Sequence, residues 1–326
     1  MKRTIAIVAG GDSSEFPVSL RSAQGLYSFM DKEKYTVYIV EMKGLCWEAV
    51  LPDGNKTAVD RNDFSFLLNG EKITFDFAYI IIHGTPGENG LLQGYFDLLH
   101  IPYSTCDVLA SALTFNKFAL NHYLQGFGIR ISDSLLVRKG SDISDQDVIK
   151  KIGLPCFIKP NEGGSSFGVT KVKTAEQIRP AIEKAMHESD EVMVEAFMAG
   201  TEITCGCYKT RTKEVVFPIT EVVSKNEFFD YAAKYDGESQ EITPARLDDD
   251  TTRRVKTLTS AIYDILGCEG IIRVDYIITE GGKINLLEVN TTPGMTATSF
   301  IPQQVRAAGL DMKDVLTDII ENKFIS

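Results

Sequence analysis

The chain has 326 residues, of which 44% are hydrophobic and 24% are charged, and its formal net charge at pH 7 is -11. This length predicts two or three domains with sizeable cores, and the composition excludes extensive disorder. The acidic balance disfavours nucleic acid or an anionic membrane surface as the main partner, so we expect small-molecule ligands.

Localisation and redox state also follow from the composition. No window is long and apolar enough to span a bilayer, and the first residues, MKRTIAIVAGG, reach glycine before a signal-peptide hydrophobic region could be completed. We therefore expect a cytoplasmic protein without a membrane partner. The six cysteines lack CxxC spacing and neighbouring histidines, which predicts reduced, mostly buried thiols rather than disulfides or zinc sites.

The first predicted unit, residues 1–103, has the element order of a βαβ fold. The apolar strand TIAIVAGG precedes the helical stretch VSLRSAQGLYSFM and the strand YTVYIVEM, which implies a small parallel sheet. A further strand, FDFAYIIIHG, ends in the glycine-rich turn HGTPGENG before the helical LLQGYFDLLH. Ligands bind at the carboxyl ends of such strands, so we expect part of a site at this turn.

The second predicted unit, residues 104–198, is a compact α+β unit. It contains a helix that carries Lys117, the strand LPCFIKP, the loop NEGGSSFG, the strand VTKVK, a helix opened by a capping box at Thr174 and Gln177, and the strand EVMVEAF. Glycine amides, serine hydroxyls and Lys159 make the loop a candidate phosphate site, although it lacks the Walker A pattern. A plain Gly/Ser hairpin between two strands remains an equal alternative.

The third predicted unit, residues 199–326, carries the densest group of functional side chains. It contains the strand EITCGCY, the aromatic segment NEFFDYAAKYDGES, the helix TRRVKTLTSAIYDILG, a hairpin and two closing helices around Val305 and Val315. The hairpin joins GIIRVDYIIT to KINLLEVN through Gly281-Gly282, which predicts a two-residue turn.

Counting back from this turn places Asp275 opposite Glu288 and Arg273 opposite Asn290, with all four side chains on one face. Opposed carboxylates destabilise a ladder unless a cation lies between them, and Mg²⁺ is usually held by one or two carboxylates plus nucleotide phosphates. A solvated hairpin whose acids pair with nearby basic residues is the alternative.

Several segments together resemble the bacterial D-alanine:D-alanine ligases of the ATP-grasp superfamily, over the whole chain. They are VAGGDSSEFPVSL, HGTPGENGLLQGYF, FIKPNEGGSSFGV, FFDYAAKY and RVDYIITEGGKINLLEVNTTPGMTATSFIP. The resemblance implies a three-domain α/β and α+β ATP-grasp fold, with an N-terminal parallel-sheet domain and ATP held between the central and C-terminal sheets. It also implies ligation of two D-alanines through an acyl phosphate for peptidoglycan synthesis, and a homodimer built through the N-terminal unit.

The resemblance further implies roles for individual residues. Those expected to contact ATP are Lys117, Lys159, Ser165, Ser166, Glu195, Glu202 and Lys234. Asp275, Glu288 and Asn290 match the ligands of two Mg²⁺ or Mn²⁺ ions, and Arg273 with the Gly294 amide matches the groups that stabilise charge on the reacting carbonyl. Those expected to hold the two amino acids or to close the site are Glu15, His83, Ser165, Tyr235, Ser299 and Phe300.

The chain departs from the family pattern at a few positions. Phe300 stands where leucine or methionine is usual, Pro17 and Gly163 stand where many relatives carry glutamate, and Asn89 replaces a common aspartate. Tyr235 favours amide formation, because ester-forming relatives typically carry histidine there. An ATP-grasp ligase with another acceptor, such as D-serine, and a silent nucleotide-binding regulatory protein are the alternatives.

Overall fold

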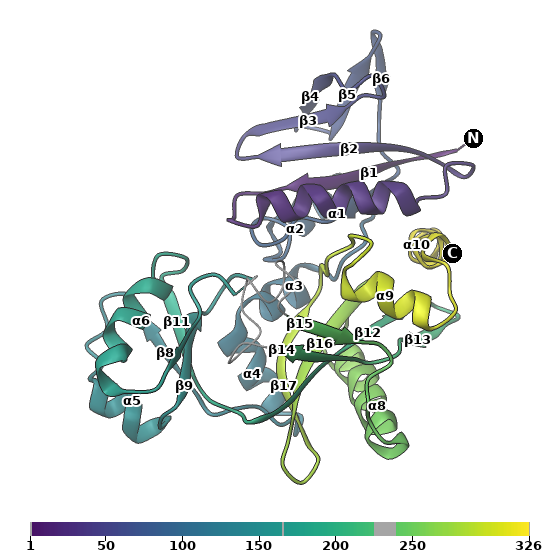
Figure 1. Cartoon of the computed structure of the whole chain (residues 1–326). Coiled ribbons are helices and arrows are strands. Elements are labelled where there is room, and N and C mark those ends of the chain that lie inside the picture. Colours follow the sequence, from purple (N-terminus) through teal and green to yellow (C-terminus); the bar gives the residue numbers. More distant parts are fainter. Residues whose placement is uncertain (1, 165, 225–238, 326) are drawn as a thin grey trace.

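The computed structural model describes residues 2–164, 166–224 and 239–325. These residues form three sheets, each with its own helices, that surround a central junction (Figure 1). The α/β and α+β fold class predicted from the sequence is confirmed. The three unit boundaries remain a prediction.

The N-terminal sheet has seven strands in the order β6-β5-β4-β3-β2-β1-β7. Strand β1 lies next to the edge strand β7. Its apolar residues are fully buried, and it pairs in parallel with β2 and β7, as the βαβ pattern predicts. Beyond β2 the sheet continues as an antiparallel meander that was not predicted, because its strands are too short for a clear alternating pattern. The strands are β1 Arg3–Gly10, β2 Tyr35–Lys43, β3 Cys46–Val50, β4 Lys56–Asp60, β5 Ser65–Leu68, β6 Glu71–Ile73 and β7 Phe77–Ile80.

Two helices of this part follow the predicted spans. Pro17 lies in the first turn of the first helix, where its missing N–H leaves no intrahelical hydrogen bond unmade. Both helices start directly after the loops that carry the predicted site residues. They are α1 Phe16–Phe29 and α2 Leu91–Leu99.

The central sheet is antiparallel, with the order β10-β9-β11-β8, and has a hydrophobic core of its own. The predicted capping box of Thr174 and Gln177 is present, and it caps a short 3-10 turn that leads into α6. A second capping box, at Ser144 and Asp147, opens a helix that was not predicted. The elements are β8 Ser134–Arg138, α5 Asp145–Lys151, β9 Cys156–Pro160, β10 Thr170–Val172, η1 Ala175–Gln177, α6 Ile178–Ala185 and β11 Glu191–Ala196.

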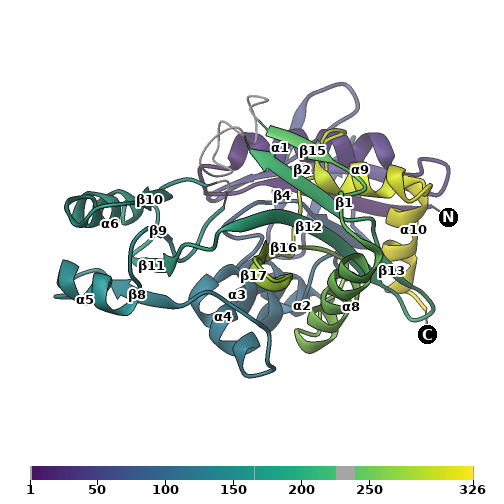
Figure 2. The ribbon, with the colours of Figure 1, turned by 60° about the horizontal axis from the view of Figure 1, so that its bottom comes forward.

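The C-terminal sheet has the order β15-β14-β12-β16-β17, with β13 beside β12. Helices α3, α4 and α8, whose ranges are given below, lie on one face of this sheet (Figure 2), and their buried residues share a core with it. Cys205 and Cys207 lie in that core, as expected from their shared strand face. The elements are α3 Val108–Phe115, α4 Lys117–Gln125, β12 Gly200–Lys209, β13 Glu214–Val216, β14 Thr220–Ser224, β15 Ser239–Ile242, α8 Asp249–Ile265, β16 Ile271–Thr279 and β17 Lys283–Asn290.

The two closing helices, α9 Phe300–Ala307 and α10 Met312–Asn322, join the C-terminal part to the N-terminal part. Residues of α9 and α10 share one core with β1 and α1, so the two ends of the chain pack together (Figure 1). Of the six cysteines, Cys46 alone is exposed and all have free thiols, which agrees with the expected reduced state. None of the helices in the described ranges is long and apolar enough to cross a membrane.

Candidate active site

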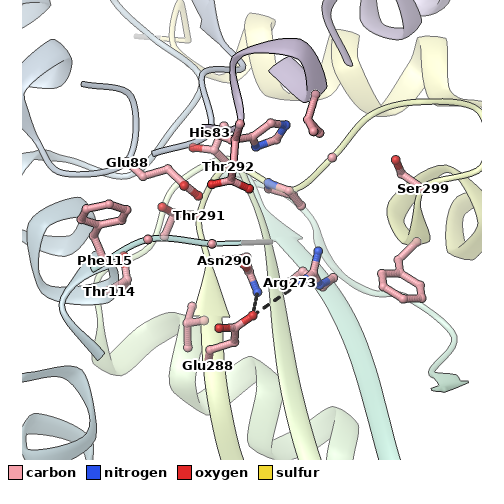
Figure 3. A pocket seen from close by; sticks show the side chains of 18 of the residues that line it. His83, Glu88, Thr114, Phe115, Arg273, Glu288, Asn290, Thr291, Thr292 and Ser299 are labelled. Carbon is pink, nitrogen blue, oxygen red and sulfur yellow. Dashed lines mark hydrogen bonds and ion pairs between the residues drawn. The ribbon is translucent and has the colours of Figure 1, made fainter. Parts of the chain in front are cut away.

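The hairpin of β16 and β17 has the register predicted from the sequence. Asp275 pairs with Glu288 and Arg273 pairs with Asn290, so their side chains emerge from one face of the sheet toward the junction. Figure 3 shows Arg273, Glu288 and Asn290 converging below the loop that carries Thr291 and Thr292. The predicted pairing of Asp275 with Glu288 and of Arg273 with Asn290 is confirmed.

The predicted two-residue turn is wrong, although the register at the acids is correct. Thr279 pairs with Lys283, so the turn has three residues, and Gly281 and Gly282 adopt the left-handed φ values of 76° and 69° that favour glycine. A β-bulge at Leu287 then adds one residue to β17 and restores the pairing of Asp275 with Glu288. The bulge also directs Leu287 and Glu288 toward the same cavity.

Arg273 neutralises Asp275 in this structure. Its Nε and Nη2 atoms donate hydrogen bonds to Asp275 Oδ1 and Oδ2 at 2.9 and 2.7 Å, and Thr204 Oγ1 donates to Oδ1 at 2.5 Å. The Asn290 amide donates to Asp275 Oδ2 at 3.1 Å and to Glu288 Oε1 at 3.4 Å. Arg273 Nη2 lies 4.0 Å from Glu288 Oε1.

Two carboxylates and one amide oxygen on a single face make a hard oxygen donor set. This set suits a divalent cation that takes its remaining ligands from phosphate and water. Over the described residues, no group of three or more His, Cys, Asp or Glu side chains could hold a metal ion.

Lys159 and Glu195 form a buried ion pair on neighbouring strands of the central sheet. Lys159 Nζ donates to Glu195 Oε2 at 2.7 Å, and the two residues are 7% and 2% exposed. Glu195 Oε1 is buried without a hydrogen-bond partner in the described part of the chain. A buried carboxylate oxygen in this state is ready to accept a hydrogen bond from a ligand.

Lys117 begins α4 and reaches the Gly/Ser loop across the junction. Its Nζ donates to the Gly163 carbonyl oxygen at 2.5 Å. Burial lowers the pKa of Lys117, and the charge of Glu288 opposes that shift. In the same loop, Ser166 has a left-handed φ of 60°. The loop is therefore in direct contact with Lys117, another residue expected to contact ATP.

A cavity of about 250 Å³ lies between the central and C-terminal sheets. Aromatic and aliphatic side chains form part of its wall, and the polar residues assigned to ATP open into it. Those residues are Lys117, Lys159, Ser166, Glu195 and Glu202, together with the metal candidates Asp275 and Glu288. An apolar slot with a few converging polar groups has the form of a ligand site.

Glu15 and His83 come from two neighbouring loops of the N-terminal sheet. Glu15 is 6% exposed, and a Cβ atom on Gly164 would lie only 2.7 Å from its Oε2 atom, so the Gly/Ser loop comes very close to the Glu15 carboxylate. His83 Nε2 lies 3.2 Å from Ser22 Oγ. Burial lowers the pKa of His83, which keeps the imidazole neutral, while the charge of Glu15 partly opposes this shift.

Glu88 is a site residue that the sequence analysis missed. It lines the same cavity as Glu15 and His83, and its Oε2 atom accepts a hydrogen bond from the Gly84 amide at 2.7 Å (Figure 3). Burial raises the pKa of Glu88 to about 8, and the charge of Glu15 adds to the effect. The signal in the sequence was an acidic residue inside the turn HGTPGENG, directly after a buried strand.

Ser299 and Phe300 stand at the start of α9. The Ser299 hydroxyl lies 2.8 Å from Thr296 Oγ1 and makes no capping bond within the helix. Because the first amides of a helix have no intrahelical partner, they can bind a carboxylate. A Cβ atom on Gly294 would lie 3.1 Å from Ser299 Oγ, so the predicted oxyanion amide and the predicted carboxylate anchor are neighbours.

A second cavity, of about 620 Å³, joins the N-terminal loops to the hairpin and to α9. It is lined by the amino-acid candidates Glu15, His83, Gly294, Ser299 and Phe300. Both cavities share the walls Lys117, Gly163, Gly164, Arg273, Glu288 and Phe300. The assignments of Ser165, Lys234 and Tyr235 lie outside the described residues.

Two family descriptions match the chain. "D-ala D-ala ligase N-terminus" matches residues 4–106 and "D-ala D-ala ligase C-terminus" matches residues 123–321. The chain belongs to the D-alanine:D-alanine ligase family. A D-alanine--D-alanine ligase of Phocaeicola vulgatus is 80% identical over 99% of this chain and 100% of its own length. One from Bacteroides fragilis is 75% identical over the same shares.

Solved structures of D-alanine ligases share the whole fold. The D-alanyl-alanine synthetase A of Vibrio cholerae has a TM-score of 0.88 and 30% identity, and covers 100% of this chain and 99% of its own. The VanG D-Ala:D-Ser ligase of Enterococcus faecalis has a TM-score of 0.86 and 31% identity, with 99% of each chain covered. The fold therefore does not separate the D-alanine acceptor from D-serine, whereas the relatives at 75–80% identity carry the D-alanine name.

Proposed function

We propose that this D-alanine ligase joins two D-alanines to D-alanyl-D-alanine, with ATP converted to ADP and phosphate, and that it thereby supplies peptidoglycan precursor synthesis. One observation carries the assignment of the reaction centre. Arg273 and Glu288 lie in the shared wall between the cavity assigned to the nucleotide and the cavity assigned to the amino acids. A phosphoryl group can pass between two ligands only where their sites meet.

In the first step the γ-phosphoryl group of ATP moves to the carboxylate of the first D-alanine, forming an acyl phosphate and releasing ADP. Lys117 and Lys159 supply positive charge to the phosphates. Two Mg²⁺ or Mn²⁺ ions held by Asp275, Glu288 and Asn290 would supply charge neutralisation in this transfer. Glu15 holds the ammonium group of the first D-alanine, beside neutral His83.

In the second step the amine of the second D-alanine attacks the acyl carbon, and phosphate leaves from a tetrahedral intermediate. Arg273 and the Gly294 amide stabilise the negative charge on its oxygen. Ser299 and the Phe300 amide hold the carboxylate of the second D-alanine at the start of α9. Ser165 and Tyr235 complete the assignment by closing the site over Glu15, with Lys234 on the phosphates.

The test is phosphate release from ATP in the presence of D-alanine, followed by the mass of the product. We expect D-alanine-dependent release and the mass of the dipeptide, with D-serine competing poorly as the acceptor. Asp275→Asn should lower the rate by about 10²-fold or more, because it removes a metal ligand and the partner of Arg273. Full activity of this variant would refute the metal assignment. No release by the wild type would favour a silent nucleotide-binding protein.

We also propose that the protein is a cytoplasmic homodimer. ATP, the proposed substrate, is a cytoplasmic metabolite. Exposed apolar side chains gather on α2 and α3, where Leu91, Leu98 and Leu109 are 63%, 82% and 74% exposed. Leu91 and Leu98 are seven residues apart on one helix face, and the Val108 carbonyl oxygen lies close to Gly90 at the start of that helix. A second copy of the same surface would cover this apolar patch.

A further inference from the structure

Phe300 departs from the residue types usual in the family, and its ring lies on Arg273. The Arg273 Cζ atom is 5.3 Å from the centroid of the ring, within the range of a cation–π contact. Phe300 is also one of the few residues that line both cavities. The ring therefore stands where the proposed reaction takes place.

The ring and Asp275 hold the guanidinium group in different ways. Asp275 binds one edge of the group through two hydrogen bonds, which fix its position within its own plane. The Phe300 ring restrains the group through a separate contact, because the Cζ atom lies over the ring. Val222, which is 7% exposed, packs against Phe300 and supports the ring.

These two restraints respond differently to a metal ion. Asp275 is a proposed metal ligand, and an oxygen that binds a cation has less negative charge to offer to Arg273. The ring has no ligand atom for a hard cation, so its contact with Arg273 persists when the metal binds. Binding of the metal therefore weakens the contact of Arg273 with Asp275 but not its contact with Phe300.

We propose that Phe300 is a positioning residue that keeps the Arg273 guanidinium on the reacting carbonyl while Asp275 binds the metal. The inference rests on the proposed function of this site. It assigns to the Phe300 side chain a role that is separate from the role of its backbone amide. An aliphatic residue of similar size fills the space without attracting the cation.

The test compares Phe300→Leu and Phe300→Tyr with the wild type, first at saturating MgATP with varied D-alanine and then at saturating D-alanine with varied ATP. We expect Phe300→Leu to lower kcat about tenfold, the factor that such a contact is worth, with the KM for ATP within about twofold of wild type. Phe300→Tyr keeps an aromatic face and should restore most of the rate. Phe300→Met serves as the aliphatic variant if Phe300→Leu does not fold.

The dependence of the rate on the Mg²⁺ concentration distinguishes a positioning role of Phe300 from a role as a passive part of the cavity lining. Without the ring, Arg273 loses a restraint that the metal does not weaken, so Phe300→Leu should need several-fold more free Mg²⁺ for half-maximal rate. Tyr27→Leu is the matched control, because it removes a cation–π contact with Lys32, 3.9 Å from the ring centroid, and Tyr27 lines neither cavity. It should change neither kcat nor the Mg²⁺ response.

Two results would overturn the inference. One is an unchanged kcat and Mg²⁺ response in Phe300→Leu, with only the KM for the second D-alanine raised. The other is a Phe300→Tyr variant as impaired as Phe300→Leu. An inactive wild type would instead refute the proposed function, so the two failures are distinguishable.

Discussion

Glu88 combines a buried carboxyl group with close acidic neighbours. The charged groups that face it are Glu15, Glu288 and Lys117, and burial is the main cause of its raised pKa of about 8. An amino-acid ligand would bring an ammonium group into this acidic pocket. The Glu88 carboxyl is thus expected to be protonated at neutral pH, and the sequence motif does not reveal this protonation state.

This raised pKa predicts how stability depends on pH. The unfolded chain has an ordinary glutamate pKa near about 4.3, so the folded state binds more protons between that value and about 8. Stability from the protonated form is therefore lost as pH rises through this window. Glu88→Gln has no carboxyl group to ionise, so it should not lose stability in this window. The difference in thermal midpoint between the variant and the wild type should therefore rise in favour of the variant from pH 5 to pH 8 and then stay constant.

Glu71→Gln is the matched control for this measurement, because Glu71 is exposed at the edge of the N-terminal sheet. Its difference from the wild type should stay constant across the same pH series. A constant difference for Glu88→Gln as well would show that the carboxyl is ionised in the folded protein throughout the window.

At the scale of the element, the start of α4 depends on one buried asparagine after β9. The Asn161 side chain is fully buried, accepts a hydrogen bond from the Phe118 amide at 2.9 Å and donates one to Glu191 Oε2 at 3.0 Å. Its backbone oxygen accepts from the Lys117 amide at 3.1 Å. Asn161 thus fixes the helix that carries Lys117 to the end of the central sheet.

Asn161→Ala should destabilise the protein by about 1–3 kcal/mol, because the buried Phe118 amide loses its acceptor. The variant should also bind ATP more weakly, since Lys117 lies one residue earlier in the helix. Denaturant unfolding and nucleotide titration measure the two effects. Asn62→Ala, at an exposed position, should stay within about 0.5 kcal/mol of wild type. Equal stability of both variants would contradict this role of Asn161.

The β16–β17 hairpin shows which details of an element can be predicted from residue spacing and which cannot. The pairing of Asp275 with Glu288 could be predicted because strand residues alternate between two faces with a fixed period. The three-residue turn and the bulge at Leu287 could not be predicted. The turn shifts the strand register by one residue and the bulge shifts it back, so the pairing of Asp275 with Glu288 is the same with both features as with neither. The bulge places Leu287 beside Glu288 in the cavity between the central and C-terminal sheets, a detail that only the fold reveals.

For the whole molecule, the exposed apolar surface of α2 and α3 predicts the oligomeric state. Leu98→Glu places a charge in the centre of the proposed dimer contact and should convert a dimer into a monomer in light scattering. Leu45→Glu is the matched control, because Leu45 is 79% exposed in the turn between β2 and β3 and lies outside the patch. A wild type that is monomeric at micromolar concentration would refute the dimer.

The sequence by itself determined the family, the fold class and the pairing of Asp275 with Glu288 in the β16–β17 hairpin. Each depends on residue types at fixed, short spacings, and local backbone geometry converts such spacings directly into neighbours. It also placed Lys117 on a helix and Lys159 at the end of a strand, but it gave these residues and Glu15 a common site only through resemblance to relatives.

Only the tertiary structure decided which of these residues meet. Glu15 and Gly164 are in contact across 149 residues of chain, and Arg273 lies under Phe300, because buried cores join α9 and α10 to the N-terminal sheet and α4 to the C-terminal sheet. The pKa of Glu88 and the ion pair of Lys159 with Glu195 depend on the same packing. Distances between remote segments follow from burial of apolar surface throughout the fold, which no local spacing encodes.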